Sequence, residues 1–209
     1  RKTKQLLSIN MIKEVVIAYY GEDLYWIKNI KSRYNFIVYN KTDIDVPHTI
    51  KLDNIGRETN TYFYHIVNNY DNLSDWVFFT QGNPIDHVKD YEFILNNFPM
   101  TLDKSKLSND ECHFFANGLF TEKIISHSDG SPYHQPFLNI NHIWEQLFEC
   151  NPPDLFEFTP GATFCVSRNQ IQKRNKEFYE KCLKITEERE LSPWEFERMM
   201  SYVFNDKIK

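Results

Sequence analysis

Residues 14–40 decide the fold: EVVIAYYGEDLYWIKNIKSRYNFIVYN. Residues 14–20 form a continuous apolar and β-branched run, which is typical of a strand covered on both faces. After the polar break at residues 21–23, apolar residues have helical spacing from 24 to 30, and Asp23 stands where it would cap that helix. Residues 35–39, NFIVY, have the pattern of a second strand. Strand, helix and strand in this order indicate a βαβ unit and a parallel sheet.

The same alternation continues along the chain. Residues 59–70 have helical spacing and lead into a buried strand that begins at Trp76. Ser192 is a good N-cap for a late helix, with Glu195 at its third position. The other predicted elements are strands at 113–116 and 162–166 and helices at 88–98, 140–148, 176–188 and 193–204. The pattern predicts an α/β fold, with a mixed, mostly parallel central sheet of about six strands flanked by helices.

The length of 209 residues suits one substantial core and is short for two. We therefore expect an N-terminal tail or expression remnant at residues 1–11 and a single domain at residues 12–209. Residues 99–136 are irregular and rich in Ser, Asn, Asp and His, which favours a lid or a binding wall over a simple connection.

Composition argues against several classes of protein. No apolar run approaches the ~20 residues that cross a bilayer, and the N-terminal sequence lacks the apolar centre of a signal peptide. A net charge of −5 argues against a nucleic-acid surface but leaves room for a local basic pocket that takes a phosphorylated small molecule. The cysteines form no CxxC pattern, which favours reduced, mostly buried thiols and a cytoplasmic location. They are Cys112, Cys150, Cys165 and Cys182.

Polar residues follow each of the first three predicted strands. In an open α/β sheet, ligands bind beyond the carboxyl ends of the strands, where the strand order reverses. Tyr19 and Tyr20 are candidates to stack on a nucleobase, and Asp23 or Asn40 to bind its edge. The alternative stays open, because aromatic residues that end a buried strand commonly belong to the core. Further candidate binding residues at these strand ends are Tyr39, Lys41, Gln81 and Gly82.

The segment DNIGRE, residues 53–58, ends where the next helix starts. Gly56 would let the backbone approach a ligand, and Arg57 can fork onto phosphate oxygens. Free N–H groups at the start of a helix attract anions, so with Asn54 this segment predicts a pyrophosphate clamp. The alternative is a plain turn with a surface ion pair between Arg57 and Glu58 or Asp53.

The stretch DWVFFTQGNPIDH, residues 75–87, carries a buried strand into amide, carboxylate and imidazole groups. If Gln81, Asp86 and His87 converge, they can hold a hard cation such as Mn²⁺ or Mg²⁺ that bridges two phosphates. The alternative is that these groups satisfy one another, with Asp86 capping a helix that begins near His87.

Four motifs in order resemble those of a family known mainly by this motif string, over about residues 15–204. They are N-x-G-R-E at 54–58, T-Y-x-x-H-I-x-x-N-Y-D-N-L-x-D-W at 61–76, F-x-Q-G-x-P at 79–84 and P-G-A-x-F-x-V-S-R-x-x-I at 160–171. The order of parts also resembles the GT-A glycosyltransferases, fringe-like enzymes among them, including small enzymes of large DNA viruses that modify capsid glycoprotein.

The resemblance implies a nucleotide site across the first βα units, with a D-x-D motif after a buried strand holding Mn²⁺ under the pyrophosphate. The third strand here offers Thr80-Gln81-Gly82 in that place, and the only literal D-x-D is Asp43-Ile44-Asp45, one strand earlier. The third strand therefore lacks the two aspartates that hold the metal in those enzymes.

In fringe-like enzymes an E-D pair after a later strand supplies the general base. The nearest matching acids here are Glu195 and Glu197, two residues apart and so on different faces of their helix. Glu197 matches the E-R part of the family string and is the preferred candidate. The alternative is a surface glutamate paired with Arg198 or Arg189.

The leading interpretation is therefore a glycosyltransferase that uses a UDP-sugar donor and a divalent metal to modify a hydroxyl of a glycan or glycoprotein. Two alternatives stay open: a non-catalytic nucleotide- or sugar-binding module of the same fold, and a hydrolase in which Asp86 and His87 activate water. We expect no nucleic-acid partner, no membrane span and a cytoplasmic location, which for a viral protein is the host cytoplasm.

Overall fold

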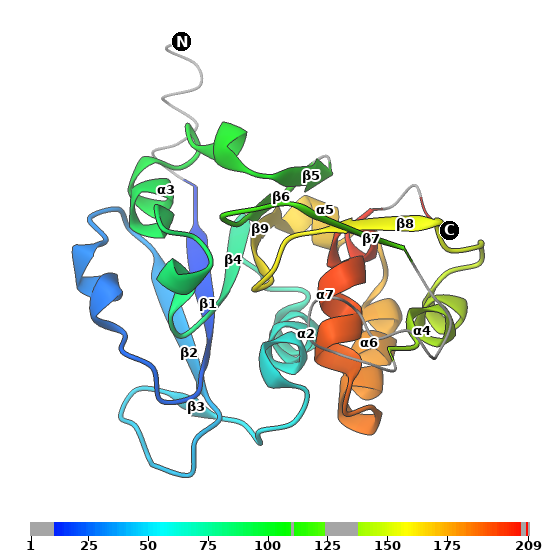
Figure 1. Cartoon of the computed structure of the whole chain (residues 1–209). Coiled ribbons are helices and arrows are strands. Elements are labelled where there is room, and N and C mark those ends of the chain that lie inside the picture. The colour runs from blue at the N-terminus through cyan, green and yellow to red at the C-terminus, as the bar shows by residue number, and fades with distance from the viewer. Residues whose placement is uncertain (1–10, 110, 124–137, 206–207, 209) are drawn as a thin grey trace.

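A computed structural model describes residues 11–109, 111–123, 138–205 and 208. Most of the predicted tail and residues 124–136 of the irregular segment lie outside the described residues. A seven-stranded sheet in the order β3-β2-β1-β4-β9-β6-β5 forms the centre (Figure 1). Its strands are β1 (Lys13–Tyr19), β2 (Asn35–Asn40), β3 (Ile50–Lys51), β4 (Trp76–Gln81), β5 (Leu107–Asn109), β6 (Cys112–Phe115) and β9 (Thr163–Ser167). A separate pair joins β7 (Phe120–Lys123) to β8 (Leu155–Phe158).

The prediction of a mixed, mostly parallel sheet is confirmed. Strands β3, β2, β1 and β4 are parallel neighbours. Strand β9 runs antiparallel to both β4 and β6, and β5 runs antiparallel to β6. The sheet has more strands than the sequence predicted because β3 and β5 are only two and three residues long, too short for an alternating pattern to be visible.

Helices cover both faces of the sheet, as the sequence predicted. One face carries α2 (Arg57–Asn69), α4 (Ile140–Leu147), α5 (Arg168–Ile171), α6 (Lys176–Glu188) and α7 (Ser192–Val203). The other carries the 3₁₀ helix η1 (Tyr25–Asn29) and α3 (Tyr91–Asn97). Short 3₁₀ turns are found at η2 (Pro84–Asp86) and η3 (Leu102–Lys104). Figure 1 shows the two groups of helices on either side of β1 and β4.

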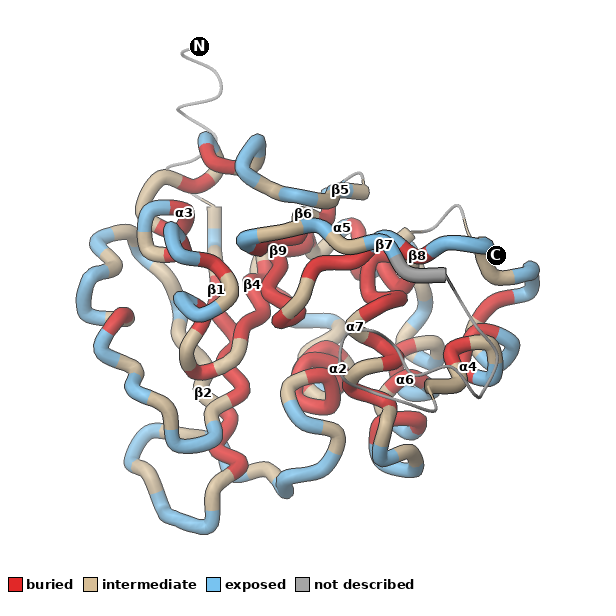
Figure 2. The backbone as a smooth tube through the Cα atoms, viewed as in Figure 1, coloured by how far each residue is buried: buried red, intermediate tan, exposed pale blue. Residues whose placement is uncertain are grey.

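Burial on both faces explains the continuous apolar runs of β1 and β4. Val16 and Phe79 pack in a cluster with α2, α6 and α7, whereas Val15 and Phe78 pack against η1 and α3. All four are fully buried, and Figure 2 shows this buried centre along the two strands. A strand that alternates between two cores needs no polar side, which is the pattern the sequence displays.

Two predicted helix starts are wrong. Ser192 is the first residue of α7 rather than its N-cap, and its buried hydroxyl has no hydrogen-bond partner among the described atoms. The helix expected at 88–98 begins at Tyr91 and follows Asp90, so Asp86, which ends η2, does not cap it.

Three of the four free cysteines, Cys112, Cys165 and Cys182, are buried, and Cys150 is exposed, so the prediction of mostly buried thiols is confirmed. Within the described ranges, no helix combines the length and the apolarity that crossing a bilayer requires.

Candidate functional site

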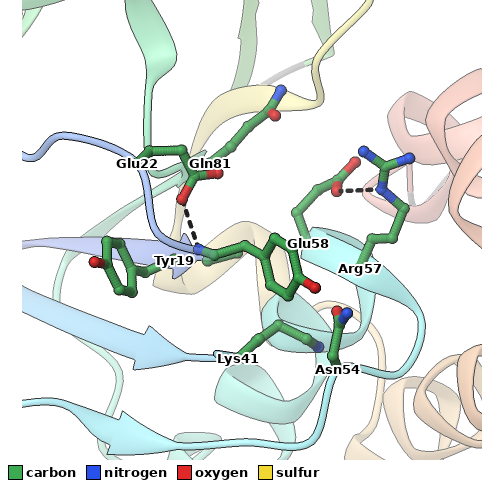
Figure 3. Close-up of a pocket in the computed structure, with 9 residues that line it drawn as sticks. Tyr19, Glu22, Lys41, Asn54, Arg57, Glu58 and Gln81 are labelled. Carbon is green, nitrogen blue, oxygen red and sulfur yellow. Dashed lines mark hydrogen bonds and ion pairs between the residues drawn. The ribbon is translucent and has the colours of Figure 1, made fainter. Parts of the chain in front are cut away.

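A pocket of about 320 Å³ opens at the carboxyl ends of β1 and β4 (Figure 3). The chain leaves β1 for β2 and β3 on one side and returns to β4 on the other, so the strand order reverses here. At such a reversal the chain connections run away to opposite sides and leave a crevice between them. Ligands of open α/β sheets bind in this crevice. Its lining residues are Ala18, Tyr19, Tyr20, Glu22, Lys41, Asn54, Arg57, Glu58 and Gln81.

Six residues that the sequence assigned to binding line this pocket together. They come from four separate segments of the chain and are Tyr19, Tyr20, Lys41, Asn54, Arg57 and Gln81. Segments that are distant along the chain therefore meet around one space. That these residues bind a nucleotide stays a prediction.

Lys41 supplies a buried positive charge to the pocket wall. Its Nζ donates to the carbonyl oxygen of Ile55 at 2.8 Å and to Oδ1 of Asn60 at 3.3 Å. Burial lowers the pKa of Lys41 to about 8, although Glu58 and Asp53 partly oppose that shift. Among the described residues, no carboxylate forms an ion pair with this desolvated ammonium, so it is suited to an incoming anion.

Arg57 is the second cation of the pocket, and it is loosely held. Its side chain is 59% exposed, and its Nε lies 3.7 Å from Oε2 of Glu58. The guanidinium carbon lies 5.2 Å from the centroid of the Trp194 ring. The ion pair with Glu58 that the sequence left as an alternative is thus present, but both partners also line the pocket.

The backbone at Arg57 is in an unusual conformation. Arg57 has φ 48° and follows Gly56 at φ 59°, so two successive residues are left-handed where α2 begins. A left-handed arginine is sterically costly, and such conformations concentrate at functional sites. The turn fixes where the Arg57 side chain leaves the backbone.

Two carboxylates of the pocket were not among the predicted site residues. Glu22 accepts a hydrogen bond from the backbone N–H of Tyr20 at 2.6 Å. Glu58 lies in the first turn of α2, with a side chain that is 16% exposed. Figure 3 shows Glu22 and Gln81 on one side of the pocket and Glu58 and Arg57 on the other. Glu22 lies in the polar break after the first strand, which was the available signal for it.

Gly161 connects the end of β4 to helix α7. The side-chain amide of Gln81 donates to the carbonyl oxygen of Gly161 at 3.2 Å, and the N–H of Gly161 donates to Oε1 of Glu197 at 2.7 Å. Gly161 has φ +84°, and a Cβ there would lie 2.5 Å from Cγ of His87. This glycine lets β4, α7 and the segment before β9 meet in one place, and it brings Glu197 beside the pocket.

Glu197 is a partly exposed carboxylate near both Glu58 and Arg57. Its side chain is 18% exposed, and its Oε2 lies 3.5 Å from Nη1 of Arg198, so the pairing with Arg198 that the sequence offered as an alternative is present as a long contact. Burial raises the pKa of Glu197, with Glu58 adding to the rise, while the Gly161 N–H, Arg198 and Arg57 oppose it. A carboxylate with a raised pKa beside a pocket is a stronger proton acceptor than an ordinary surface glutamate.

Glu195, the other candidate base, is wrong for that role. Its side chain is fully buried. It accepts from Nε and an Nη of Arg189 at 3.0 and 2.6 Å and from the backbone N–H of Asn139 at 2.7 Å. With both oxygens bound inside the protein, Glu195 has no contact with the pocket, and its role is to join α7 to the start of α4.

Three further candidates lie outside the pocket lining. Tyr39 is buried, with its hydroxyl 3.0 Å from Nδ1 of His65. Asn40 is buried, and its side-chain amide bonds to the following turn: it donates to the carbonyl oxygen of Ile44 at 2.7 Å and accepts from the N–H of Thr42 at 2.9 Å. Asp23 accepts from the N–H of Tyr25 at 2.8 Å and so holds the first turn of η1, near its predicted capping role. These contacts correct their assignment to ligand binding.

Gly56 and Gly82 are required by internal packing rather than by the approach of a ligand. A Cβ on Gly56 would lie 2.8 Å from the carbonyl oxygen of Thr186 in α6. A Cβ on Gly82 would lie 2.4 Å from Oε2 of Glu22. Gly56 therefore lets α2 pack against α6, and Gly82 makes room for a carboxylate that lines the pocket.

The predicted metal ligands do not fit a resident metal ion. Asp86 is exposed at the end of η2, His87 packs against Gly161, and the Gln81 amide is directed to Gly161 as well. In the part of the chain that the structure describes, no three His, Cys, Asp or Glu side chains gather closely enough to hold a metal. The expectation of Mn²⁺ or Mg²⁺ has no support from these residues.

The chain matches a known family. The profile of a family described as "Protein of unknown function (DUF3431)" matches residues 15–207 of the chain. The match takes in every segment that lines the pocket and also Glu197. No curated protein and no solved structure matches the chain.

Proposed function

We propose that this chain, which belongs to the DUF3431 family, is a glycosyltransferase. It moves a sugar from a nucleotide diphosphate donor, UDP-linked, to a hydroxyl of a glycan or glycoprotein. The observation that carries this proposal is the mixed chemistry of the pocket: Lys41 and Arg57 stand beside Glu22 and Glu58 at the reversal of strand order.

A nucleotide sugar matches both kinds of charge. Its diphosphate is bound by an ammonium and a forked guanidinium, and its sugar hydroxyls donate to carboxylates. A simple anion would need only the cations, and a neutral sugar would need only the acceptors. Tyr19 and Tyr20 add two aromatic rings to the lining, one of them 61% exposed, which supports a stacked base at the mouth of the pocket.

Charge on the departing diphosphate is the main electrostatic demand of the reaction. Lys41 is positioned before the donor arrives by Ile55 and Asn60, so little reorganisation is needed when charge develops. Arg57 adds a second positive charge, and the first turn of α2 adds the positive end of the helix dipole. Because the predicted ligands do not fit a metal, no step of this mechanism passes through a metal ion.

Glu197 acts as the general base. The acceptor hydroxyl oxygen forms a bond to the anomeric carbon, the bond from that carbon to the diphosphate oxygen breaks, and the hydroxyl proton passes to the Glu197 carboxylate. Its raised pKa and the fixed hydrogen bond from Gly161 support this role. A positioned base of this kind contributes ~10²- to 10⁴-fold in rate.

The proposal is tested by incubating the protein with a panel of UDP-sugars and glycan acceptors and measuring UDP release and the mass of the acceptor. We expect UDP release that depends on the acceptor and an acceptor that gains one sugar. Binding of UDP without turnover would support the non-catalytic module instead. Free sugar released without an acceptor would support the hydrolase.

Calorimetric titration of UDP tests the part assigned to the cations. Because Lys41 and Arg57 carry the charge compensation, the affinity for UDP is expected to be the same with Mn²⁺ and with a chelator. UDP binding that requires Mn²⁺ would show that a metal ion takes part in the site, and it would contradict the arrangement proposed for the diphosphate.

A further inference from the structure

Arg57 stands between the pocket and a half-buried tryptophan. It lines the pocket, while its guanidinium lies over the ring of Trp194 with 5.2 Å between the guanidinium carbon and the ring centroid. Trp194 precedes Glu197 by three residues on α7, so both side chains lie on the same side of that helix. Arg57 therefore lies between the pocket and the Trp194 indole, and Glu197, the candidate base, lies on the same side of α7 as that indole.

The contacts that hold Arg57 over the indole are weak. Its side chain is 59% exposed, and its ion pair with Glu58 is long at 3.7 Å. Exposed ion pairs and exposed cation–ring contacts both contribute little, whereas forked bonds from a guanidinium to phosphate are among the strongest polar contacts. A diphosphate in the pocket therefore draws the guanidinium away from the indole.

The backbone restricts this movement to the side chain. Gly56 is fixed against Thr186, and the left-handed turn sets the start of α2. Arg57 can swing about its own side-chain bonds, from Trp194 toward the pocket, while α2 stays in place.

An uncovered indole beside a carboxylate suits one chemical class of ligand. A pyranose presents a face of C–H groups that packs on a flat aromatic ring, and at its edge it presents hydroxyls that donate to a carboxylate. Trp194 offers the ring and Glu197 offers the acceptor on the same helix face.

We propose that Arg57 gates an acceptor subsite: it covers Trp194 in the free protein and uncovers it when a diphosphate binds, so that a pyranose stacks on the indole with a hydroxyl at Glu197. The inference rests on the proposed function and deepens it, because it names the acceptor class and an order of binding. The donor binds first, and the acceptor binds tightly only afterwards.

The gate is tested by ¹⁹F NMR on protein labelled with 5-fluorotryptophan. The Trp194 resonance is assigned by its loss in Trp194→Phe, and pyrophosphate is the probe of the pocket. We expect pyrophosphate to move the Trp194 resonance toward its position in ligand-free Arg57→Ala and to have no such effect in that variant. Arg33→Ala, at an exposed arginine outside the pocket lining, should behave as wild type.

A second titration tests the sugar subsite with a panel of neutral methyl pyranosides. In wild type, pyrophosphate should raise the affinity for a bound pyranoside about fivefold or more, and the pyranoside should raise the affinity for pyrophosphate by the same factor. In Arg57→Ala the pyranoside should bind equally well with and without pyrophosphate. In Trp194→Phe its affinity should fall while pyrophosphate still binds.

Calorimetry with pyrophosphate separates failure of the gate from failure of the proposed function. If pyrophosphate binds but the Trp194 resonance does not move, the gate is wrong and the donor pocket stands. The same holds if pyrophosphate binds but neither pyrophosphate nor Arg57→Ala changes the affinity for the pyranoside. If pyrophosphate does not bind, the donor pocket and the gate are both overturned.

Discussion

Helix α7 presents two glutamates to two different environments. Glu195 is fully buried and bonded through both oxygens to Arg189 and Asn139. Glu197, two residues later, accepts from the Gly161 N–H through Oε1, makes only a long contact of 3.5 Å to Nη1 of Arg198 through Oε2, and lies close to the charges of the pocket. The sequence presents them as equivalent acids, and the difference lies in how completely the protein satisfies each one. A saturated carboxylate stabilises the fold, while a carboxylate with spare capacity is available to a ligand.

The same contrast separates two polar clusters beside α2. Glu14, His65 and Tyr39 form a buried chain in which Nε2 of His65 lies 3.2 Å from Glu14 and Nδ1 lies 3.0 Å from Tyr39. Lys41 and Arg57 instead face an open pocket of about 320 Å³. Both clusters are polar and partly ionisable, but only the second has groups free to meet another molecule. The predictions below test this division from its largest expected consequence to its smallest.

Replacing Glu197 by Gln should give the largest effect, a large fall in turnover with little change in stability. We expect turnover to fall ~10²- to 10⁴-fold because the amide cannot accept the acceptor proton. UDP affinity should change little. The amide oxygen still accepts from Gly161, and the lost ion pair with Arg198 is long at 3.5 Å, so the free energy of unfolding should fall by about 1 kcal/mol or less. Because the pKa of Glu197 is raised, wild-type turnover should fall as pH drops through a value above 4.5, and that acid limb should be lost in the variant.

The control for this variant is Glu180→Gln, at an exposed glutamate of α6. Steady-state kinetics with the best donor and acceptor from the panel gives the turnover, and urea denaturation gives the stability. Equal turnover in the Glu197 variant and in the control would reject Glu197 as the base.

Replacing Glu195 by Gln should have the opposite result. Removing one charge of a buried pair leaves Arg189 without its partner, so we expect the free energy of unfolding to fall by about 3 kcal/mol. The folded fraction should keep its UDP affinity. Urea denaturation followed by calorimetry on folded protein measures both. A variant that keeps its stability but loses turnover would reverse the assignment of the two glutamates.

Replacing Lys41 by Met should weaken UDP binding and stabilise the protein. Loss of a charged donor to phosphate predicts a fall in affinity of about tenfold or more. The buried charge opposes folding, but the Met variant also leaves Ile55 O and Asn60 Oδ1 without their donor, so we expect a net gain of about 1 kcal/mol. Calorimetry and urea denaturation measure the two effects, and a less stable variant would make Lys41 structural.

The pH dependence of Lys41 gives the same distinction in the wild type. Burial lowers the pKa of Lys41 to about 8 in the folded protein, so the unfolded chain binds this proton more tightly. The contribution of Lys41 to stability should therefore rise from about pH 8 to about pH 10.5, while UDP affinity falls over the same range as the positive charge is lost. Lys41→Met should show neither change.

The smallest effect is expected in the closed cluster. Tyr39→Phe removes one buried hydrogen bond to His65, so the free energy of unfolding should fall by about 1 kcal/mol. UDP affinity should be unchanged, because Tyr39 does not line the pocket. A clear loss of UDP binding in this variant would show that the buried cluster also supports ligand binding, and it would contradict the division between the two clusters.

The sequence predicts those parts of the fold that depend on local pattern. Helices α2, α6 and α7 lie within two residues of their expected ranges because each carries an apolar stripe over more than ten residues. Strands β7 and β8 were missed because they pair with each other outside the central sheet and lack a continuous apolar run.

The sequence predicts mainly those site residues that directly follow a buried strand. Residues after β1, β2 and β4 were found, because polar residues there contrast with the buried strands that they follow. The sequence indicates Glu58 only as an ion-pair partner of Arg57, and no local pattern marks Trp194 as a site residue. Both acquire their place when α2, α7 and the Gly161 turn pack together, and that packing depends on contacts between residues far apart in the sequence.

A crystal structure of the protein with UDP, grown without added metal, tests the central claim most directly. The account predicts the diphosphate within hydrogen-bond distance of Lys41 and Arg57, at the carboxyl ends of β1 and β4, with the Arg57 guanidinium moved from Trp194 toward the phosphates. A nucleotide bound at another surface, with this pocket still open, would contradict it.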